Sequence, residues 1–161
     1  MKKILLAGLV GTALAVSCTA TQNAQVAQNN RADFLKLKGD WQITSVDYNK
    51  GFKIKPFDEG ADAQCFVGSN WRLIPNNYTG SYTLGGGVDC PAVSRNIKFE
   101  IVGGSEFKFK KIEEGTKAKQ NTVGYSLQVV NLSENNMTLQ QNVPFEGEYI
   151  TVTYNFVRTG K

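Results

Sequence analysis

The sequence contains no histidine, and this absence limits the chemistry that its side chains can perform. It removes Ser-His and Cys-His nucleophile pairs, imidazole acid-base catalysis and the commonest metal ligand. Two carboxylate pairs occur, Glu113 with Glu114 and Glu146 with Glu148, but both lie in or beside expected loops and are interpreted as solvated surface. We therefore predict no catalytic residue, no metal and no cofactor. An enzyme that uses Cys65 or a carboxylate is the open alternative.

Residues 1–17 have the pattern of an export signal. Lys2 and Lys3 precede an apolar stretch that is too short to span a membrane comfortably and that closes on small residues. The segment ends in LAVSC, which resembles the lipobox of bacterial lipoproteins. That resemblance implies that Cys18 becomes the lipidated first residue of the mature chain, and several acyl chains would hold it lastingly on a membrane. A plain secretory signal, with an ordinary thiol at Cys18, is the alternative.

The residues after Cys18 predict a flexible tether over residues 18–31. The run TATQNAQVAQNNR is polar, almost uncharged and without apolar periodicity, so it cannot bury enough surface to become ordered. Residues 32–161 then have a suitable length for one domain with one core. The only helical candidate is a turn around ADFLKL.

Cys65 and Cys90 remain as an even pair in a chain directed to an oxidising compartment, so we expect a disulfide between them. Closing a loop of about 25 residues stabilises a small domain by about 3 to 4 kcal/mol in the chain-entropy account. Two free thiols, one of them reactive, are the alternative.

The charge balance argues against nucleic acid as a partner. The formal net charge is +4, and removal of Lys2 and Lys3 with the signal would lower it to about +2. Basic residues are interspersed with acidic ones, as in KKIEEGTKAK, so no stripe of one sign exists.

Strand signals dominate the domain. Apolar and polar residues alternate in short runs that are separated by Gly, Pro, Asn, Asp and Ser. We predict eight strands, at Trp41–Tyr48, Cys65–Leu73, Tyr78–Leu84, Arg95–Ile101, Glu106–Ile112, Gly124–Leu132, Met137–Gln141 and Glu148–Arg158.

The predicted connections alternate in length, at about sixteen, four, ten, four, eleven, four and six residues. In an up-and-down antiparallel sheet successive connections lie at opposite ends, so the long loops would frame one end of a cup. Eight strands are about the number at which a closed barrel holds side chains or one small ligand. We predict an all-β, eight-stranded, antiparallel up-and-down barrel, with a solid sandwich as the alternative.

The period of two assigns an aromatic face to the interior, while Phe52, Ile54 and Phe57 from the first long loop would line its mouth. The hydroxyls of inward tyrosines, including Tyr78, need partners: a ligand, water or one another. Such an interior suits a small apolar molecule, although side chains alone could fill it. The candidate ligand-binding residues are Phe52, Trp71, Tyr82, Phe99, Phe107, Phe109, Tyr125, Leu127, Met137, Leu139, Val152 and Tyr154.

The narrow end of the barrel would be closed by three residues from the two ends of the domain. Arg158 has the inward parity of the last strand and should reach Trp41 at the start of the first. A guanidinium over an indole contributes about 0.5 to 2 kcal/mol. Gly39 would let the incoming chain cross beneath the barrel without a side chain in the way.

These residues resemble the lipocalins. The G-x-W at Gly39 and Trp41 opens the first of eight meandering strands, and Arg158 ends the last. LKGDWQITSVDY, CFVGSNWRLIPNNYTGSYTL and YITVTYNFVR are similar to the lipocalin-like lipoproteins of Bacteroidetes-type bacteria. The chain departs from the animal lipocalins in lacking T-D-Y-x-x-Y and a helix after the barrel.

The resemblance implies a monomeric, non-enzymatic cup that binds a small hydrophobic or amphipathic ligand. Its lipid anchor would hold it in the bacterial cell envelope, on the periplasmic or surface face of the outer membrane. The alternative is a structural or interaction lipoprotein with a filled barrel. The charges expected at the mouth nearly cancel, so they predict no charge for the ligand.

Overall fold

A computed structural model describes the protein over residues 17–49 and 51–161. The predicted signal peptide lies outside the described residues apart from Ser17. One helix, α1 (Ser17–Lys36), precedes eight strands. The strands are β1 (Gly39–Asp47), β2 (Asn70–Ile74), β3 (Thr79–Gly87), β4 (Cys90–Val102), β5 (Glu106–Ile112), β6 (Tyr125–Leu132), β7 (Asn136–Phe145) and β8 (Glu148–Gly160).

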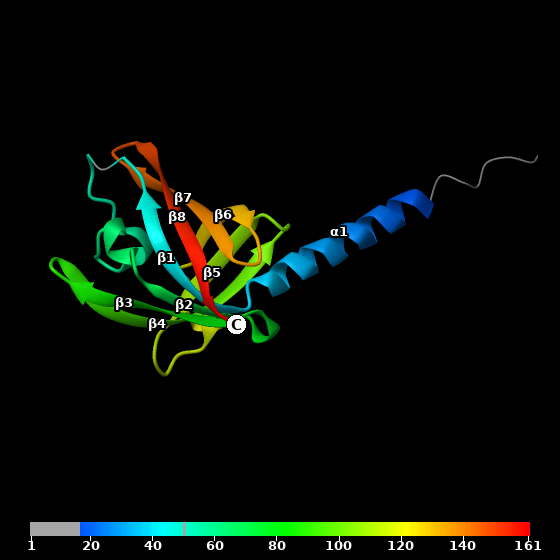
Figure 1. The fold of residues 1–161 in the computed structure, drawn as a ribbon, viewed down its shortest axis with the longest axis horizontal. Coiled ribbons are helices and arrows are strands. Elements are labelled where there is room, and N and C mark those ends of the chain that lie inside the picture. The colour runs from blue at the N-terminus through cyan, green and yellow to red at the C-terminus, as the bar shows by residue number, and fades with distance from the viewer. Residues whose placement is uncertain (1–16, 50) are drawn as a thin grey trace, which may run out of the picture.

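The strands form one closed barrel in chain order, in which every neighbour is antiparallel and β8 returns to pair with β1 (Figure 1). The predicted eight-stranded up-and-down barrel is therefore confirmed, and the sandwich is excluded. Closure gives each described strand a neighbour on both sides, which removes long free sheet edges, the usual template for aggregation. Alternate residues such as Trp41, Ile43, Phe107 and Phe109 point inward and are buried, as the period of a strand requires.

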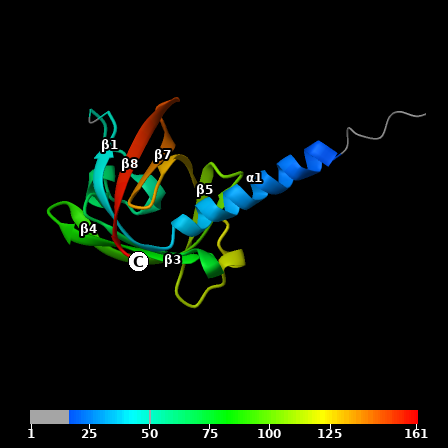
Figure 2. The same cartoon turned by 45° about the vertical axis from the view of Figure 1, so that its right-hand side comes forward.

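α1 occupies the segment that the sequence analysis assigns to a tether without regular structure. It projects away from the barrel, and its last two turns, from Asn30 onward, approach the barrel (Figures 1 and 2). Its Ala, Gln and Arg residues have a high propensity for helix. The tether prediction considered only how much apolar surface the segment could bury, so it did not take this propensity into account. Phe34 is buried, and Leu37 just after the helix is buried as well. Residues 20–29 are exposed, so the domain boundary at residue 32 stays a prediction.

Two connections predicted as long loops are tight turns. β3 ends at Gly87 and β4 begins at Cys90, so only Val88 and Asp89 join them. In the same way, Glu146 and Gly147 join β7 to β8. Both turns contain left-handed residues, with φ of 61° at Asp89 and 47° at Glu146. The β3–β4 hairpin extends beyond the barrel (Figure 1). Its outer part therefore has no buried face and shows no alternating pattern.

The connection between β1 and β2 is longer than predicted, because Cys65 and Phe66 are not in a strand. They belong to a 3-10 turn (Ala63–Phe66), and Gly68 with a φ of 81° separates that turn from β2. Residues 48–69 form what is called below the β1–β2 loop. In the part of the chain that the structure describes, no helix has both the length and the apolar character needed to cross a membrane.

Candidate functional site

The end of the barrel next to α1 is closed by Trp41 and Arg158. The two residues are partners in the β1–β8 ladder, and the guanidinium carbon of Arg158 lies 4.2 Å from the centroid of the Trp41 ring. Arg158 donates hydrogen bonds to the backbone oxygens of Lys36, Lys38 and Glu134, and the indole N–H of Trp41 donates to Leu37 at 2.9 Å. This end is therefore sealed by packed and fully bonded groups.

Gly39 is required at this closed end by the close approach of two backbones. A Cβ atom at this position would lie 2.5 Å from the backbone oxygen of Gly160 and 2.6 Å from Nη1 of Arg158. Its φ of 128° also lies in the region that favours glycine. The three residues predicted to close the barrel thus meet at one place.

The barrel gathers most of the predicted ligand-binding residues in its interior. Tyr125 is half-buried, and Phe52 is the exception, because its ring is 38% exposed and packs on Phe145 at the rim, with centroids 4.8 Å apart. Phe52, which the sequence predicts at the mouth, therefore lies at the rim, and its contact with a ligand stays a prediction. The buried members are Trp71, Tyr82, Phe99, Phe107, Phe109, Leu127, Met137, Leu139, Val152 and Tyr154.

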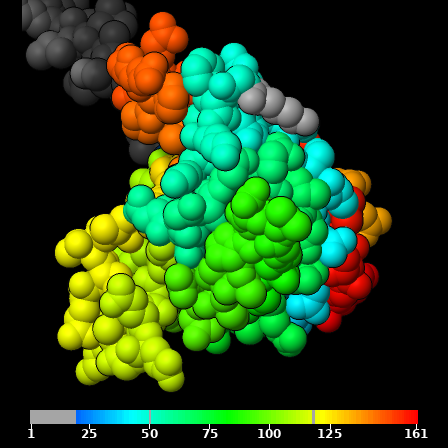
Figure 3. All heavy atoms as spheres, turned by 90° about the vertical axis from the view of Figure 1, so that its left-hand side faces the viewer, coloured from blue at the N-terminus to red at the C-terminus, as the bar shows by residue number. Residues whose placement is uncertain are grey.

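The β1–β2 loop fills the end of the interior opposite Trp41. The predicted mouth residues Ile54 and Phe57 are buried instead, with 1% and 3% of their surface exposed, and Phe66 is fully buried. The Phe57 ring lies centrally in the aromatic cluster, with centroids 5.1 Å from Phe109 and 5.3 Å from Phe66. Figure 3 shows this loop, in cyan to teal, lying across the face of the molecule beside the green β3–β4 hairpin.

Phe57 is held in an unusual backbone conformation. Phe57 and Asp58 have φ values of 59° and 51°, which place two successive residues with side chains in the left-handed region. That conformation costs about 1 to 3 kcal/mol for each residue and persists only where the surroundings impose it. The packing of the Phe57 ring and the bonds of the next residue, Glu59, supply this constraint.

Glu59 fastens the loop to the strands through three side chains. Its carboxylate is 1% exposed and accepts two hydrogen bonds from Arg95, at 3.0 and 3.1 Å, and one from Tyr82 at 2.5 Å. Lys111 forms an ion pair with it at 3.2 Å and also donates to the backbone oxygen of Phe57 at 2.7 Å. Burial alone would raise the pKa of the Glu59 carboxyl, but bonds from Arg95, Tyr82 and Lys111 hold that pKa below its usual value.

Loop carboxylates also satisfy two tyrosine hydroxyls. Tyr125 donates to Asp58 at 2.8 Å and Tyr48 donates to Asp62 at 2.7 Å. Burial and the bond to Asp62 raise the pKa of Tyr48 to about 12. Tyr154 donates to Gln141 at 3.2 Å. Within residues 17–49 and 51–161 no buried side-chain nitrogen or oxygen lacks a partner, so the interior is satisfied by the chain itself.

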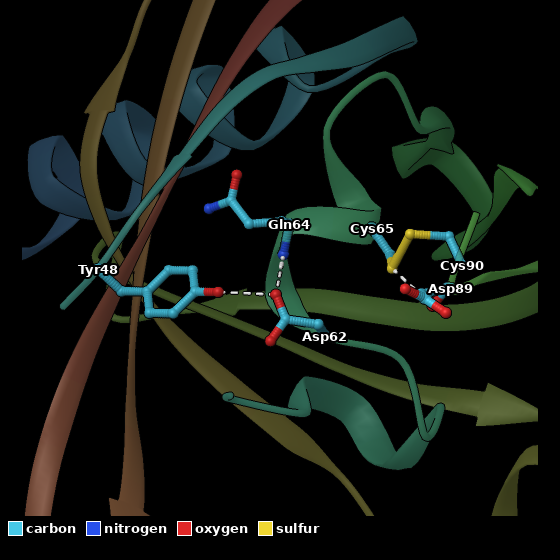
Figure 4. The surroundings of a disulfide bond; sticks show 6 residues. All are labelled: Tyr48, Asp62, Gln64, Cys65, Asp89 and Cys90. Atoms are coloured by element: carbon cyan, nitrogen blue, oxygen red, sulfur yellow. Dashed lines mark hydrogen bonds between the residues drawn. A yellow bond between two sulfur atoms is a disulfide. The ribbon is translucent and has the colours of Figure 1, made fainter. Parts of the chain in front are cut away.

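The predicted disulfide ties the second half of the loop to the β3–β4 hairpin. Cys65 and Cys90 are joined with an S–S distance of 2.07 Å, which confirms the pairing. Figure 4 shows the disulfide together with Asp62, which accepts bonds from Tyr48 and from the backbone of Gln64 at 2.9 Å. The disulfide and Glu59 thus hold the loop to the strands at two separate points.

Two cavities open on the outside of the barrel. A mainly apolar groove of about 450 Å³ lies over β4, β5 and β6. A polar cavity of about 810 Å³ lies between the first half of β4 and the segment after β5, where Arg95 and Glu113 are among its lining residues. Among the residues described, no group of three or more His, Cys, Asp or Glu side chains is placed to hold a metal ion.

Comparison with known proteins identifies the family. Residues 37–139 match the lipocalin-like domain, a span of more than half the chain. The chain belongs to the lipocalin-like family. This confirms the lipocalin resemblance, which the G-x-W at Gly39 and Trp41 and the closing Arg158 carry. A search of curated proteins gives no match.

Solved structures similar to this lipocalin-like chain come from animals. The bovine lipocalin allergen Bos d 2 is 16% identical, with a TM-score of 0.48, over 78% of this chain and 74% of that one. Lobster apocrustacyanin A1 is 14% identical, with a TM-score of 0.46, over 86% and 68%. Bovine odorant binding protein, solved in complex with a selenium-containing odorant, is 13% identical, with a TM-score of 0.43, over 78% and 71%.

Proposed function

We propose that this lipocalin-like protein binds a small hydrophobic or amphipathic molecule inside the barrel, at the place that Phe57 occupies, while a lipid on Cys18 holds it in the bacterial cell envelope. Members of the lipocalin family typically bind small hydrophobic ligands. The LAVSC sequence at Cys18 supports the lipid anchor. Binding requires no catalytic group, in keeping with the absence of histidine.

The proposal rests on one observation: the ring at the centre of the barrel comes from a loop and not from a strand. The strands supply the wall, but Phe57 comes from a loop and contacts rings from several strands, among them Trp71, Phe109 and Tyr154. Withdrawal of the loop segment that carries this ring would open a space lined by aromatic side chains, together with its approach. An apolar ligand that replaces the ring exchanges one buried apolar surface for another, which keeps the cost low.

One segment of the loop is suited to movement. Phe57 and Asp58 are strained in the left-handed region, and Gly51 and Gly60 lie on either side of them. The disulfide at Cys65 fixes the later part of the loop. Residues 51–60 are held by the Glu59 bonds, the Tyr125–Asp58 bond, the Lys111 bond to the Phe57 backbone and the packing of Ile54 and Phe57. Movement of this segment alone would open the barrel without disturbing the strands.

The test compares binding of the neutral fluorescent probe N-phenyl-1-naphthylamine to the wild-type protein and to two variants. Phe57→Ala removes the ring that the probe must displace, and we expect binding to tighten by about tenfold or more. Glu59→Gln releases the loop without making a cavity, and a tightening in the same direction is expected. Val67→Ala, in the same loop but 43% exposed, is the matched control and should bind as the wild type does.

A filled barrel that acts as a structural or interaction lipoprotein is the second candidate. It is favoured by the complete hydrogen bonding of the interior and by the burial of Phe57 and Phe66. Under this function the probe binds neither the wild type nor a folded Phe57→Ala variant. Equal binding by all variants would place the probe elsewhere and would refute a site at Phe57.

A further inference from the structure

We propose that the outer groove over β4, β5 and β6 is a second binding site, separate from the barrel interior, for a long-chain amphipathic anion such as a fatty acid. Its volume of about 450 Å³ lies within the range of small-molecule sites, and its walls are mainly apolar. Phe57 and Glu59 are not among its lining residues, and a ligand in the groove does not need the Phe57 ring to move, so the inference does not depend on the proposed function.

The groove lies beside a short ladder of the barrel wall. β5 pairs with β6 only from Glu106 to Phe109, opposite Tyr125 to Gln128. Beyond Phe109, β5 continues along β4 to Ile112 without a partner in β6. The groove follows the end of this ladder, and Phe109, Gly124 and Tyr125 are among its lining residues.

Tyr78 supplies an aromatic wall from outside the barrel. The alternation of the sequence predicts that the Tyr78 ring lies in the interior, and this prediction is wrong. The residue follows a 3-10 turn, has a φ of 59° and is 47% exposed. Phe34 of α1 stacks on the ring, with centroids 5.2 Å apart, and so fixes its position. An exposed aromatic ring held in this way offers a rigid surface to an apolar chain.

The charge of the groove is positive. Lys98 of β4 lies directly opposite Lys110 of β5, an arrangement of like charges that destabilises a ladder. Lys108 lines the groove as well and is paired with Glu106 at 3.2 Å, while Glu100 is the one carboxylate among the lining residues. The lining therefore carries three lysines against one glutamate.

Lys98 and Lys110 are available to an anion. Within the described residues neither ammonium lies within 4.0 Å of a carboxylate oxygen. Lys98 donates to the backbone oxygen of Asn77 at 3.0 Å, and Lys110 donates to that of Asn121 at 3.4 Å. An ammonium has three donors, so each lysine keeps two for a ligand. Both lysines are half-buried and line the groove. A lysine can lay its stem along apolar surface and keep its head in water, which suits a ligand that is apolar along its length and charged at one end.

The experiment titrates the folded protein with dodecanoate and with the neutral analogue dodecanol, and follows backbone amide shifts by NMR. We expect dodecanoate to shift residues 98–110 and 124–126, and dodecanol to bind about tenfold more weakly. The double variant Lys98→Gln, Lys110→Gln should lose about tenfold in affinity for dodecanoate. Lys53→Gln, an exposed lysine of the β1–β2 loop, is the matched control and should change nothing.

The outcomes separate this site from the barrel interior. Phe57→Ala should leave the affinity for dodecanoate at the groove unchanged, whatever it does to interior binding, even though loss of the ring moves the starting shifts of its neighbours Phe109 and Tyr125. The inference is overturned if dodecanoate shifts only residues 48–69, if the double variant binds as tightly as the wild type, or if nothing binds. It is also overturned if the two lysines matter only for binding vesicles of an anionic phospholipid, which would make the groove a contact with a membrane surface.

Discussion

Replacement of Glu59 by glutamine measures how firmly the β1–β2 loop is fastened over the barrel. The substitution keeps the size of the side chain and one acceptor oxygen but removes the charge that Arg95, Lys111 and Tyr82 share. The Glu59 side chain is 1% exposed, whereas Arg95 and Lys111 are 44% and 21% exposed. Water can therefore resolvate the two cations in part after the charge is lost.

This difference in exposure sets the expected magnitude. Loss of one partner from a fully buried ion pair costs about 3 to 5 kcal/mol, and loss of an exposed pair costs about 1 kcal/mol or less. A buried carboxylate with half-exposed partners lies between these limits. We expect Glu59→Gln to lower the free energy of unfolding by about 2 kcal/mol at pH 7.

Urea unfolding at several pH values is the assay. The pKa of Glu59 is lowered in the folded protein, so its contribution is complete above its ordinary pKa of 4.5 and is lost as the pH falls through the lower folded value. The difference between wild type and Glu59→Gln should therefore be constant near pH 7 and shrink below pH 4.5. The surface variant Glu114→Gln is the control. A difference that does not change with pH, or one no larger than that of the control, would refute the role given to Glu59.

Three further predictions concern the barrel end, the disulfide and the anchor. Gly39→Ala places a methyl group 2.5 Å from a backbone oxygen of β8 and should cost about 2 kcal/mol or more by chemical denaturation, whereas Gly85→Ala, with open space around it, should cost under 1 kcal/mol. Reduction of Cys65–Cys90 should lower the melting temperature and raise amide hydrogen exchange first in residues 48–69, and uniform exchange would contradict the tie. Cys18→Ser should move the protein from the membrane to the soluble envelope fraction, and unchanged fractionation would exclude lipidation at Cys18.

The barrel was predictable because its signals are local and periodic. Trp41, Phe107 and Tyr154 each stand in a run with period two, and the parity of Arg158 was enough to place it beside Trp41. The hairpin ends were missed for a related reason. Residues from Gly85 to Asp89 are exposed beyond the core, so no burial imposes alternation on them, and the glycines there indicate a loop.

The filling of the barrel was not predictable from periodicity, because a loop has none. Phe57 and Phe66 are apolar residues in an irregular segment, and their burial depends on where the loop folds back. The density of apolar residues in this long loop, Ile54 and Ala61 among them, was the available signal. Glu59 was interpreted as one of several surface charges, since nothing in the sequence identifies Arg95 and Lys111 as its partners.

The barrel is proposed to carry a small molecule where Phe57 now packs. The most direct test uses the protein isolated from its native membrane. Gentle extraction followed by native mass spectrometry should show a stoichiometric small hydrophobic molecule, which Phe57→Trp, with a bulkier ring in the same place, should exclude. A mass equal to that of the lipidated chain alone, together with a reproducible protein partner, would contradict the carrier function and support the filled barrel.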